Sequence, residues 1–261
     1  MQGSANLNIM IKAARKAGRS LVKDFREVEN LQVSRKGAGD FVSRADLAAE
    51  AILREELLGA RPTYGYLGEE TKEVQGEDPT RRWIVDPLDG TTNFLHGQPH
   101  FAISIAVQTD GVLQAALVYD PIKDEMFCAE RGQGATMNNR PIRSSGRDFL
   151  PDCLIGVGAP YKGHGNWDSF ARRSQRVVTE TSGLRRSGAA SLDLAYVACG
   201  RLDAFCEDYL KPWDIAAGAL LVTEARGLVS SISGAPFDLA SGEVLATNQV
   251  LQPSLVKLLN S

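Results

Sequence analysis

The strongest constraint on this chain is a short apolar run that ends in two carboxylates, within WIVDPLDGTTNF at residues 83–94. The apolar residues 83–85 are typical of a buried strand, Pro87 ends that strand, and the Gly-Thr-Thr sequence that follows indicates a turn into a helix. Asp86 and Asp89 therefore lie at one strand-to-helix corner, where both carboxylates can point at the same place. The alternative interpretation is an ordinary turn with two capping carboxylates.

Further oxygen and amide groups surround that corner. The Leu88 carbonyl lies between the two carboxylates, and the amides of Gly90 and Thr91 lie just behind, at a helix N-terminus that favours an anion. Oxygen ligands beside an anion site are typical of a Mg²⁺-dependent phosphoryl-transfer centre. No cysteine lies in a phosphate-binding loop of the covalent kind, so we expect water to be the nucleophile.

Composition excludes several other classes of protein. The chain has 261 residues, of which 43% are hydrophobic and 23% charged, and its net charge is −3. These values are ordinary for a soluble globular protein and predict no nucleic-acid partner. Paired arginines at 81–82, 172–173 and 185–186 are typical of solvated faces or subunit contacts. Four cysteines without a CxxC pair predict free thiols, and no signal-like pattern or membrane-length apolar run occurs, so we expect a cytoplasmic protein without a membrane partner.

The first half of the chain reads as helices followed by strands. Apolar residues at helical spacing predict a helix over 7–26, and Asp46 opens a second helix. The glycine-rich segment 34–40 is expected to be a mobile loop or loose hairpin, and the charged segment 71–82 a surface connection. Strands are expected at 64–67, 101–109, 112–120, 125–130 and around Ala135, with a hairpin turn at Asp110-Gly111. This order predicts an antiparallel-rich sheet covered on one face.

Segment 144–152 is the expected boundary between an N-terminal α+β half, 1–148, and a C-terminal α/β half, 149–261. Beyond it, expected strands (153–158, 204–207, 228–230, 244–246) alternate with expected helices (167–181, 190–199, 215–226 and from Gln252). The helix over 167–181 should turn Phe170, Ser174, Val177 and Val178 inward. This alternation predicts a mixed or parallel sheet between helices.

Three motifs together carry a resemblance to a known family. They are Gly68-Glu69-Glu70, the stretch D-P-L-D-G-T-T-N-F, and Pro212-Trp213-Asp214-Ile215-Ala216-Ala217-Gly218. In this order and spacing they resemble the inositol monophosphatase family, most closely its bacterial inositol-1-monophosphatase branch of the SuhB type, from about Leu7 to the C-terminus. The resemblance implies an α/β (mixed α+β) fold in which both halves form one compact catalytic unit of α-β-α-β-α layers, shared with sugar bisphosphatases.

The resemblance also implies the metal ligands. Glu69, Asp86 and the Leu88 carbonyl would bind one Mg²⁺, while Asp86, Asp89 and Asp214 would bind a second, and a third, weaker ion would lie near Glu69. The residues alone leave other interpretations open. Asp214 lies at the start of an apolar helix, where it can cap backbone N–H groups, and sequence alone does not separate Glu69 from the adjacent Glu70.

The resemblance implies catalytic and substrate roles for further residues. The Thr91 hydroxyl would take the proton of the attacking water and would be held by Asp46, while Glu69 orients the water. Glu207 would accept hydrogen bonds from polyol hydroxyls; the alternative interpretation is a solvent-facing glutamate at the end of a strand. The backbone at Gly188, Ala189 and Ala190 would contact the substrate, and Gly90 and Thr91 its phosphate. The loop between Lys36 and Asp40 would close near the metals. His96 and His100 are expected to be structural or to lie at the rim.

These expectations define a Mg²⁺-dependent, Li⁺-sensitive phosphomonoesterase that hydrolyses inositol 1-phosphate to inositol and phosphate, and by analogy a homodimer. The main alternatives are related phosphatases acting on histidinol phosphate, fructose 1,6-bisphosphate or adenosine 3′,5′-bisphosphate. For a bisphosphate we expect additional cationic contacts, and the sequence near the motifs offers no obvious basic set. A regulatory protein-binding module that keeps only the fold is the alternative from another class, and it predicts eroded ligands.

Overall fold

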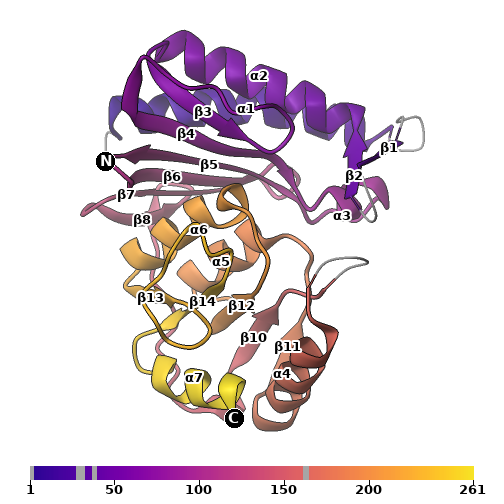
Figure 1. Ribbon diagram of the computed structural model, residues 1–261, viewed down its shortest axis with the longest axis vertical. Coiled ribbons are helices and arrows are strands. Elements are labelled where there is room, and N and C mark those ends of the chain that lie inside the picture. Colours follow the sequence, from indigo (N-terminus) through magenta and orange to yellow (C-terminus); the bar gives the residue numbers. More distant parts are fainter. Residues whose placement is uncertain (1–2, 28–32, 37–39, 161–164) are drawn as a thin grey trace.

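The computed structural model of the protein describes residues 3–27, 33–36, 40–160 and 165–261. Its helices and sheets stack in five alternating layers (Figure 1). Along the long axis these layers are helices α1 (Ala5–Phe25) and α2 (Arg44–Ala60), a seven-stranded sheet, helices α5 (Ala190–Ala198) and α6 (Pro212–Glu224), a five-stranded sheet, and helices α4 (Trp167–Glu180) and α7 (Gln252–Asn260). This confirms the α-β-α-β-α order that the resemblance implies.

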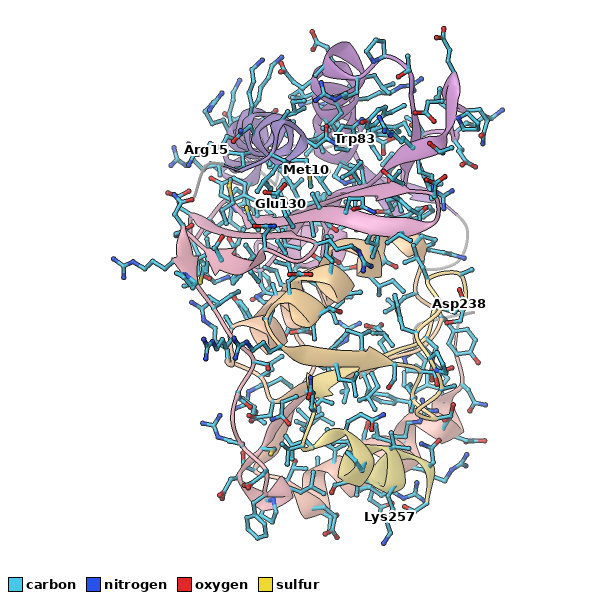
Figure 2. All side chains as sticks on the ribbon, turned by 90° about the vertical axis from the view of Figure 1, so that its left-hand side faces the viewer. Met10, Arg15, Trp83, Glu130, Asp238 and Lys257 are labelled. Carbon is cyan, nitrogen blue, oxygen red and sulfur yellow. The ribbon has the colours of Figure 1, made fainter. Side chains whose placement is uncertain are left out.

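The outer helices α1 and α2 cover one face of the first sheet. Helix α1 begins where the Ser4 hydroxyl accepts a hydrogen bond of 3.2 Å from the Leu7 amide, a typical N-cap. Its apolar residues recur every three or four positions, so Met10, Ala17 and Leu21 form one fully buried stripe. Figure 2 labels Met10 and Trp83 among the side chains that fill the space between these helices and the sheet.

The first sheet has the strand order β3-β4-β5-β6-β7-β8-β9, antiparallel except for the parallel pair β3–β4. A two-residue turn joins β5 to β6, with Asp110 at φ 50° and Gly111 at φ 77°, which confirms the predicted hairpin. The strand bounds are β3 (Tyr64–Gly68), β4 (Asp78–Asp89), β5 (Ala102–Thr109), β6 (Val112–Asp120), β7 (Glu125–Glu130), β8 (Gly134–Met137) and β9 (Arg140–Pro141).

Two expectations about this half are wrong. Strand β4 begins at Asp78, inside segment 71–82, because main-chain pairing of Arg81 and Arg82 with β5 extends the strand through charged residues. The sheet is covered on both faces, since Ile84, Ala106 and Val118 pack in a second core with α5 and α6. Strand β5 is buried over nearly its whole length, which is the pattern of a strand with both faces covered.

The second sheet has the order β11-β10-β12-β14-β13 and mixes parallel with antiparallel pairs, as predicted. Helices α5 and α6 pack on one face, and α4 and α7 on the other. In α4, Val177 is fully buried but Val178 is 62% exposed, so the prediction that Val178 faces inward is wrong. The strand bounds are β10 (Leu154–Val157), β11 (Gly183–Arg185), β12 (Ala204–Glu207), β13 (Gly227–Ser230) and β14 (Val244–Asn248), and the boundary segment holds the short 3-10 helix η2 (Leu150–Asp152).

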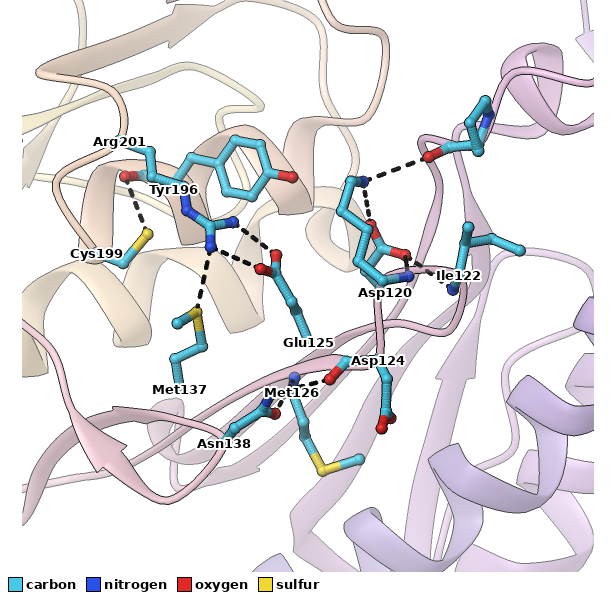
Figure 3. Close-up of polar contacts among 12 residues, drawn as sticks. Asp120, Ile122, Asp124, Glu125, Met126, Met137, Asn138, Tyr196, Cys199 and Arg201 are labelled. Carbon is cyan, nitrogen blue, oxygen red and sulfur yellow. Dashed lines mark hydrogen bonds and ion pairs between the residues drawn. The ribbon is translucent and has the colours of Figure 1, made fainter.

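Helix α5 is tied to the first sheet near its C-terminal end. Arg201, which follows α5, forms two hydrogen bonds of 2.6 Å with the Glu125 carboxylate at the start of β7 (Figure 3). The same guanidinium lies 5.0 Å from the centre of the Tyr196 ring. A bidentate pair of this kind fixes orientation as well as distance. The contact therefore fixes α5 against a strand of the other half.

Two smaller features also match expectation. Strands β1 (Val33–Lys36) and β2 (Asp40–Ser43) pair in antiparallel fashion, which fits the predicted loose hairpin. Residues 37–39 lie outside the described residues, so the predicted motion of this loop stays a prediction. The four cysteines are free thiols. In the described ranges, no helix is long and apolar enough to cross a membrane.

Candidate active site

A β-bulge brings the two motif aspartates together at the end of β4. Asp86 pairs opposite Ser104, but Asp89 pairs opposite Ala102, so three steps along β4 match two along β5. Side chains three apart in a regular strand face opposite sides of the sheet, and one extra residue corrects this. The Leu88 amide donates a hydrogen bond of 2.9 Å to Asp86 Oδ1, which holds the bulge closed.

Asp89 reaches from the first half of the chain to the second. Its Oδ2 accepts hydrogen bonds from the Ser191 amide at 2.7 Å and the Ser191 hydroxyl at 2.5 Å. Ser191 lies in the first turn of α5, where backbone amides favour an anion. Burial raises the pKa of Asp89 to about 6, although hydrogen bonds from Ser191 and its neighbours oppose the rise.

Asp214 caps a helix and also lies near the other acidic side chains. Helix α6 begins at Pro212 rather than at the expected 215, so Asp214 lies within its first turn, and its Oδ2 accepts a hydrogen bond of 2.6 Å from the Lys211 amide. It is therefore a capping residue. Its pKa is nevertheless raised well above the ordinary value, first by burial and then by the negative charge of Asp89. It therefore belongs to the same acidic cluster.

Asp86 lies at the centre of this cluster. Burial is the largest cause that raises its pKa, and the charges of Glu69, Asp89, Asp214 and Asp46 follow in that order. Glu69 and Glu70 both line the cavity beside this cluster. Asp46, Asp86 and Asp89 are buried, whereas Glu69 is exposed and Asp214 is half-buried. Carboxylates that repel one another in this way favour a cation between them.

The cluster is not a ready-made metal cage. Over the described ranges, no group of three or more His, Cys, Asp or Glu side chains is placed to hold an ion unaided. Mg²⁺ is usually held by one or two carboxylates together with waters and substrate phosphate, rather than by an all-protein cage. The hard oxygen donors and their mutual repulsion therefore fit Mg²⁺, whereas they do not match a closed site such as structural zinc.

Thr91 lies where the resemblance places a catalytic hydroxyl. Its hydroxyl donates to Asp46 Oδ2 at 3.2 Å and to the Leu88 carbonyl at 3.0 Å. Asp46 is fully buried on α2. Gly90, with φ 93°, precedes Thr91 and the short helix α3 (Thr91–Leu95). This backbone conformation favours glycine and turns the chain sharply at the end of β4.

A cavity of about 440 Å³ opens above the acidic cluster and is lined by both halves of the chain. Asp46, Asp86, Leu88 and Asp89 lie buried beside it, and Ala189 and Ala190 are also buried rather than in its wall. His96 and His100 are not among the described residues that line it. The lining includes six of the expected residues, Glu69, Gly90, Thr91, Gly188, Glu207 and Asp214.

Glu207 occupies a confined position in the cavity wall. A Cβ on Gly158 would lie 1.7 Å from Glu207 Cδ, so only glycine leaves room for this side chain. Burial raises the pKa of Glu207 well above its ordinary value, the charges of Asp214 and Asp89 raise it further, and Arg186 opposes them. Glu207 is therefore held in the cavity wall beside Asp89 and Asp214.

The expectation that no basic set lies near the motifs is wrong. Arg173, Arg186 and Lys211 line the cavity, because α4, the loop before α5 and the loop before α6 meet there. Arg173 is paired with Asp208 at 2.5 Å. A Cβ on Gly188 would lie 3.0 Å from Arg186 Nη1, so the guanidinium lies against the Gly188 backbone. The only sequence signal for Arg186 was its place two residues before Gly188.

Together these features define a layered α/β protein with an acidic cavity lined by its two halves. The chain belongs to the inositol monophosphatase family, whose family model matches residues 4–261. Membership of this family supports a phosphatase function.

Similar proteins cover nearly the whole chain. An inositol-1-monophosphatase from Mesorhizobium japonicum is 54% identical over 98% of this chain and 97% of its own length. A protein named Nus factor SuhB from Escherichia coli is 42% identical over 96% of this chain and 92% of its own. The crystal structure of the extragenic suppressor protein suhB from Bartonella henselae has a TM-score of 0.96 and 50% identity, covering 99% of both chains.

Proposed function

We propose that this protein is a Mg²⁺-dependent phosphomonoesterase that hydrolyses inositol monophosphates, such as inositol 1-phosphate, to inositol and phosphate. The observation that carries the proposal is the acidic cluster beside a cavity, in which Glu69, Asp89 and Asp214 all raise the pKa of Asp86. The name inositol-1-monophosphatase, carried by relatives that are 54% and 52% identical, supports the substrate.

The acidic residues would hold two to three Mg²⁺ ions per site. When bound, Mg²⁺ stabilises negative charge on the phosphate oxygens and makes the attacking water more acidic. The proposed ligands are Glu69, Asp86, the Leu88 carbonyl, Asp89 and Asp214. Because Asp86 and Asp89 come from one half and Asp214 from the other, halves 1–148 and 149–261 would act as one catalytic unit.

The remaining residues would orient water and substrate. Thr91 Oγ1, 3.2 Å from Asp46 Oδ2, would accept the proton of the attacking water and pass its own proton to Asp46, while Glu69 orients that water. The new O–P bond forms as the P–O bond to the inositol oxygen breaks, this oxygen takes up a proton from solvent water, and Asp46 returns its proton to solvent. Glu207 would accept hydrogen bonds from the inositol hydroxyls, and the backbone around Gly188, Ala189 and Ala190 would contact the ring.

A panel of substrates tests this proposal. Phosphate release would be measured from inositol 1-phosphate, histidinol phosphate, fructose 1,6-bisphosphate, adenosine 3′,5′-bisphosphate and glycerol 2-phosphate, each with Mg²⁺, with EDTA, and with Mg²⁺ plus Li⁺. We expect Mg²⁺-dependent, Li⁺-sensitive turnover that is highest on inositol 1-phosphate. A different preferred substrate would keep the metal chemistry and change the specificity. Absence of turnover on every substrate by folded protein would refute the proposal.

The second candidate is a regulatory, protein-binding role. Relatives that are 46% and 42% identical are named Nus factor SuhB rather than after an enzyme. A module that keeps only the fold has no need of ligands, yet Glu69, Asp86, Asp89, Thr91 and Asp214 are all present. We therefore propose that any regulatory role is additional to catalysis and does not replace it.

We also propose a cytoplasmic homodimer, by analogy with the family. Light scattering coupled to size exclusion would show twice the mass of 28.2 kDa. A single symmetric peak at the mass of one chain would refute the dimer and leave the enzymatic proposal intact.

A further inference from the structure

Helix α2 carries two buried carboxylates one turn apart. Asp46 and Glu50 are both fully buried, and residues four apart lie on the same face of a helix. Asp46 Oδ2 accepts the hydroxyl of Thr91, in α3. Glu50 instead contacts the loop after β3, where its Oε2 accepts a hydrogen bond of 2.7 Å from the Glu70 amide and its Oε1 accepts a short one from the Thr71 hydroxyl.

Glu50 contacts the residues on either side of Glu69 in the sequence and is not among the described residues that line the cavity. It binds the two residues that follow Glu69, and it also packs on the one that precedes it. A Cβ on Gly68 would lie 2.5 Å from Glu50 Oε1 and 2.9 Å from its Cδ, so glycine is needed there for Glu50 to approach. The backbone is thereby held on both sides of Glu69, whose side chain is left to line the cavity.

We propose that Glu50 is a positioning residue that fixes the Glu69 loop relative to Thr91. The proposal rests on the proposed function, in which Glu69 binds metal and orients water. The Glu69 loop binds Glu50 and Thr91 binds Asp46, and both carboxylates lie on helix α2. The two attachment points are therefore separated by about one α-helical turn, about 6 Å along the axis. Hydrogen bonds to a buried carboxylate are strong and directional. Loosening the loop moves the Glu69 carboxylate away from the place where Asp86 and Thr91 need it.

The test compares Glu50→Gln with a matched change on the same helix. A glutamine presents an NH₂ group to one of the two donors, so one hydrogen bond is lost and the shape is kept. Glu56→Gln is the control, because Glu56 pairs with Lys12 and Lys16, away from the cavity. Thr71→Val is a second variant that removes only the hydroxyl donor and keeps the proposal testable if Glu50→Gln does not fold.

Three measurements follow each variant: Mg²⁺ affinity by calorimetry without substrate, hydrogen exchange of the Glu70 amide by NMR, and KM with kcat at saturating Mg²⁺. We expect Glu50→Gln to bind Mg²⁺ about tenfold more weakly, as is typical for residues that orient metal ligands. The Glu70 amide should exchange faster, and the KM for inositol 1-phosphate at saturating Mg²⁺ should stay the same. Thr71→Val should show the same changes to a smaller extent, and Glu56→Gln none.

Unchanged Mg²⁺ affinity together with unchanged Glu70 exchange in folded Glu50→Gln would overturn the positioning role. So would an equal loss in Glu56→Gln, since that would show a general effect on the helix. Failure of the unaltered protein to bind Mg²⁺ would refute the proposed function instead. In that case Glu70 exchange still decides whether Glu50 holds the loop.

Discussion

The carboxylate of Asp89, at the end of β4, accepts two hydrogen bonds from Ser191, in the first turn of α5. This pair joins a strand of the N-terminal half to a helix of the C-terminal half directly at the acidic cluster. Arg201 and Glu125 join the other end of α5 to the same sheet. The relative position of the two sets of acidic residues is thus fixed from both ends of one short helix.

Ser191→Ala should weaken this junction without removing it. The variant loses the hydroxyl hydrogen bond to a buried carboxylate, which contributes about 1.5–3 kcal/mol, and keeps the amide. We expect lower kcat/KM for inositol 1-phosphate, because Asp89 gains freedom, and a modest loss of unfolding free energy in urea. Ser230→Ala is the control, since Ser230 is also buried but its hydroxyl donates to the neighbouring Ser231 carbonyl. Equal kcat/KM in Ser191→Ala and the unaltered protein would contradict this prediction.

Removing one carboxylate of the cluster should abolish activity without unfolding the protein. Asp89→Asn and Asp214→Asn each remove a negative charge that raises the pKa of Asp86, so repulsion in the metal-free protein falls. We expect turnover to be abolished and folding to be kept, by circular dichroism. Mg²⁺ should raise the Tm of the unaltered protein, since a ligand at a hundred times its Kd stabilises by about 2.7 kcal/mol, and should raise that of either variant less. Activity at the unaltered level in either variant would refute the ligand assignment.

Much of this site could be predicted because its signals are local. Asp86, Pro87 and Asp89 lie within four consecutive positions, and the Asp110-Gly111 turn follows from its two residues alone. The layer order came from the resemblance, because no periodicity shows which face of a strand a distant helix will cover. The small residues Ala102 and Ala106 gave no sign that α5 and α6 would pack on them.

The relationships missed from sequence all join distant segments. Glu50 and Glu70 are twenty positions apart, and Asp89 and Ser191 are a hundred and two apart. The bulge that aligns Asp86 with Asp89 depends on pairing with β5, which residue types do not reveal. Arg186 looked like part of a solvated pair until the fold placed it in the cavity wall.

Glu207→Gln should affect substrate more than metal. Glu207 lines the cavity beside Gly158, and glutamine keeps its shape while exchanging one acceptor oxygen for a donor. We expect the KM for inositol 1-phosphate to rise by about tenfold, the equivalent of about 1.4 kcal/mol, with little change in Mg²⁺ affinity by calorimetry. Glycerol 2-phosphate, which offers fewer hydroxyls, should be affected less. An equal loss on both substrates would count against a role in specificity.

Arg186→Gln should weaken binding of anionic substrates. Its guanidinium lies against Gly188 in the cavity wall, where it opposes the negative charges around Glu207. We expect a higher KM for both inositol 1-phosphate and fructose 1,6-bisphosphate, with the larger rise for the bisphosphate because it carries a second anionic group. The adjacent Arg185→Gln is a close control, since Arg185 is not among the described residues that line the cavity and donates to the Leu184 carbonyl. Similar kinetics in the two variants would show that only general charge matters.

Asp193 should give the metal-free protein a pH-dependent stability. It is 1% exposed on α5, and its Oδ1 has no hydrogen-bond partner among the described residues. Burial raises its pKa to about 7, Asp89 adds to the rise, and Ser187 and Arg186 oppose it. A raised pKa in the folded state means that this stability is fully present below the unfolded value of 3.8, is lost as pH rises from there to about 7, and changes little at higher pH.

Asp193→Asn is uncharged throughout this range, so it should lose less stability between about pH 5 and about pH 7, by at most about 1.4 kcal/mol per pH unit. Urea unfolding in EDTA at the two ends of that range measures the difference. The acidic cluster titrates in both proteins, so only the change in slope reports on Asp193. Parallel pH dependence in the two proteins would mean that Asp193 keeps one protonation state across the range, and that burial in α5 does not control its charge.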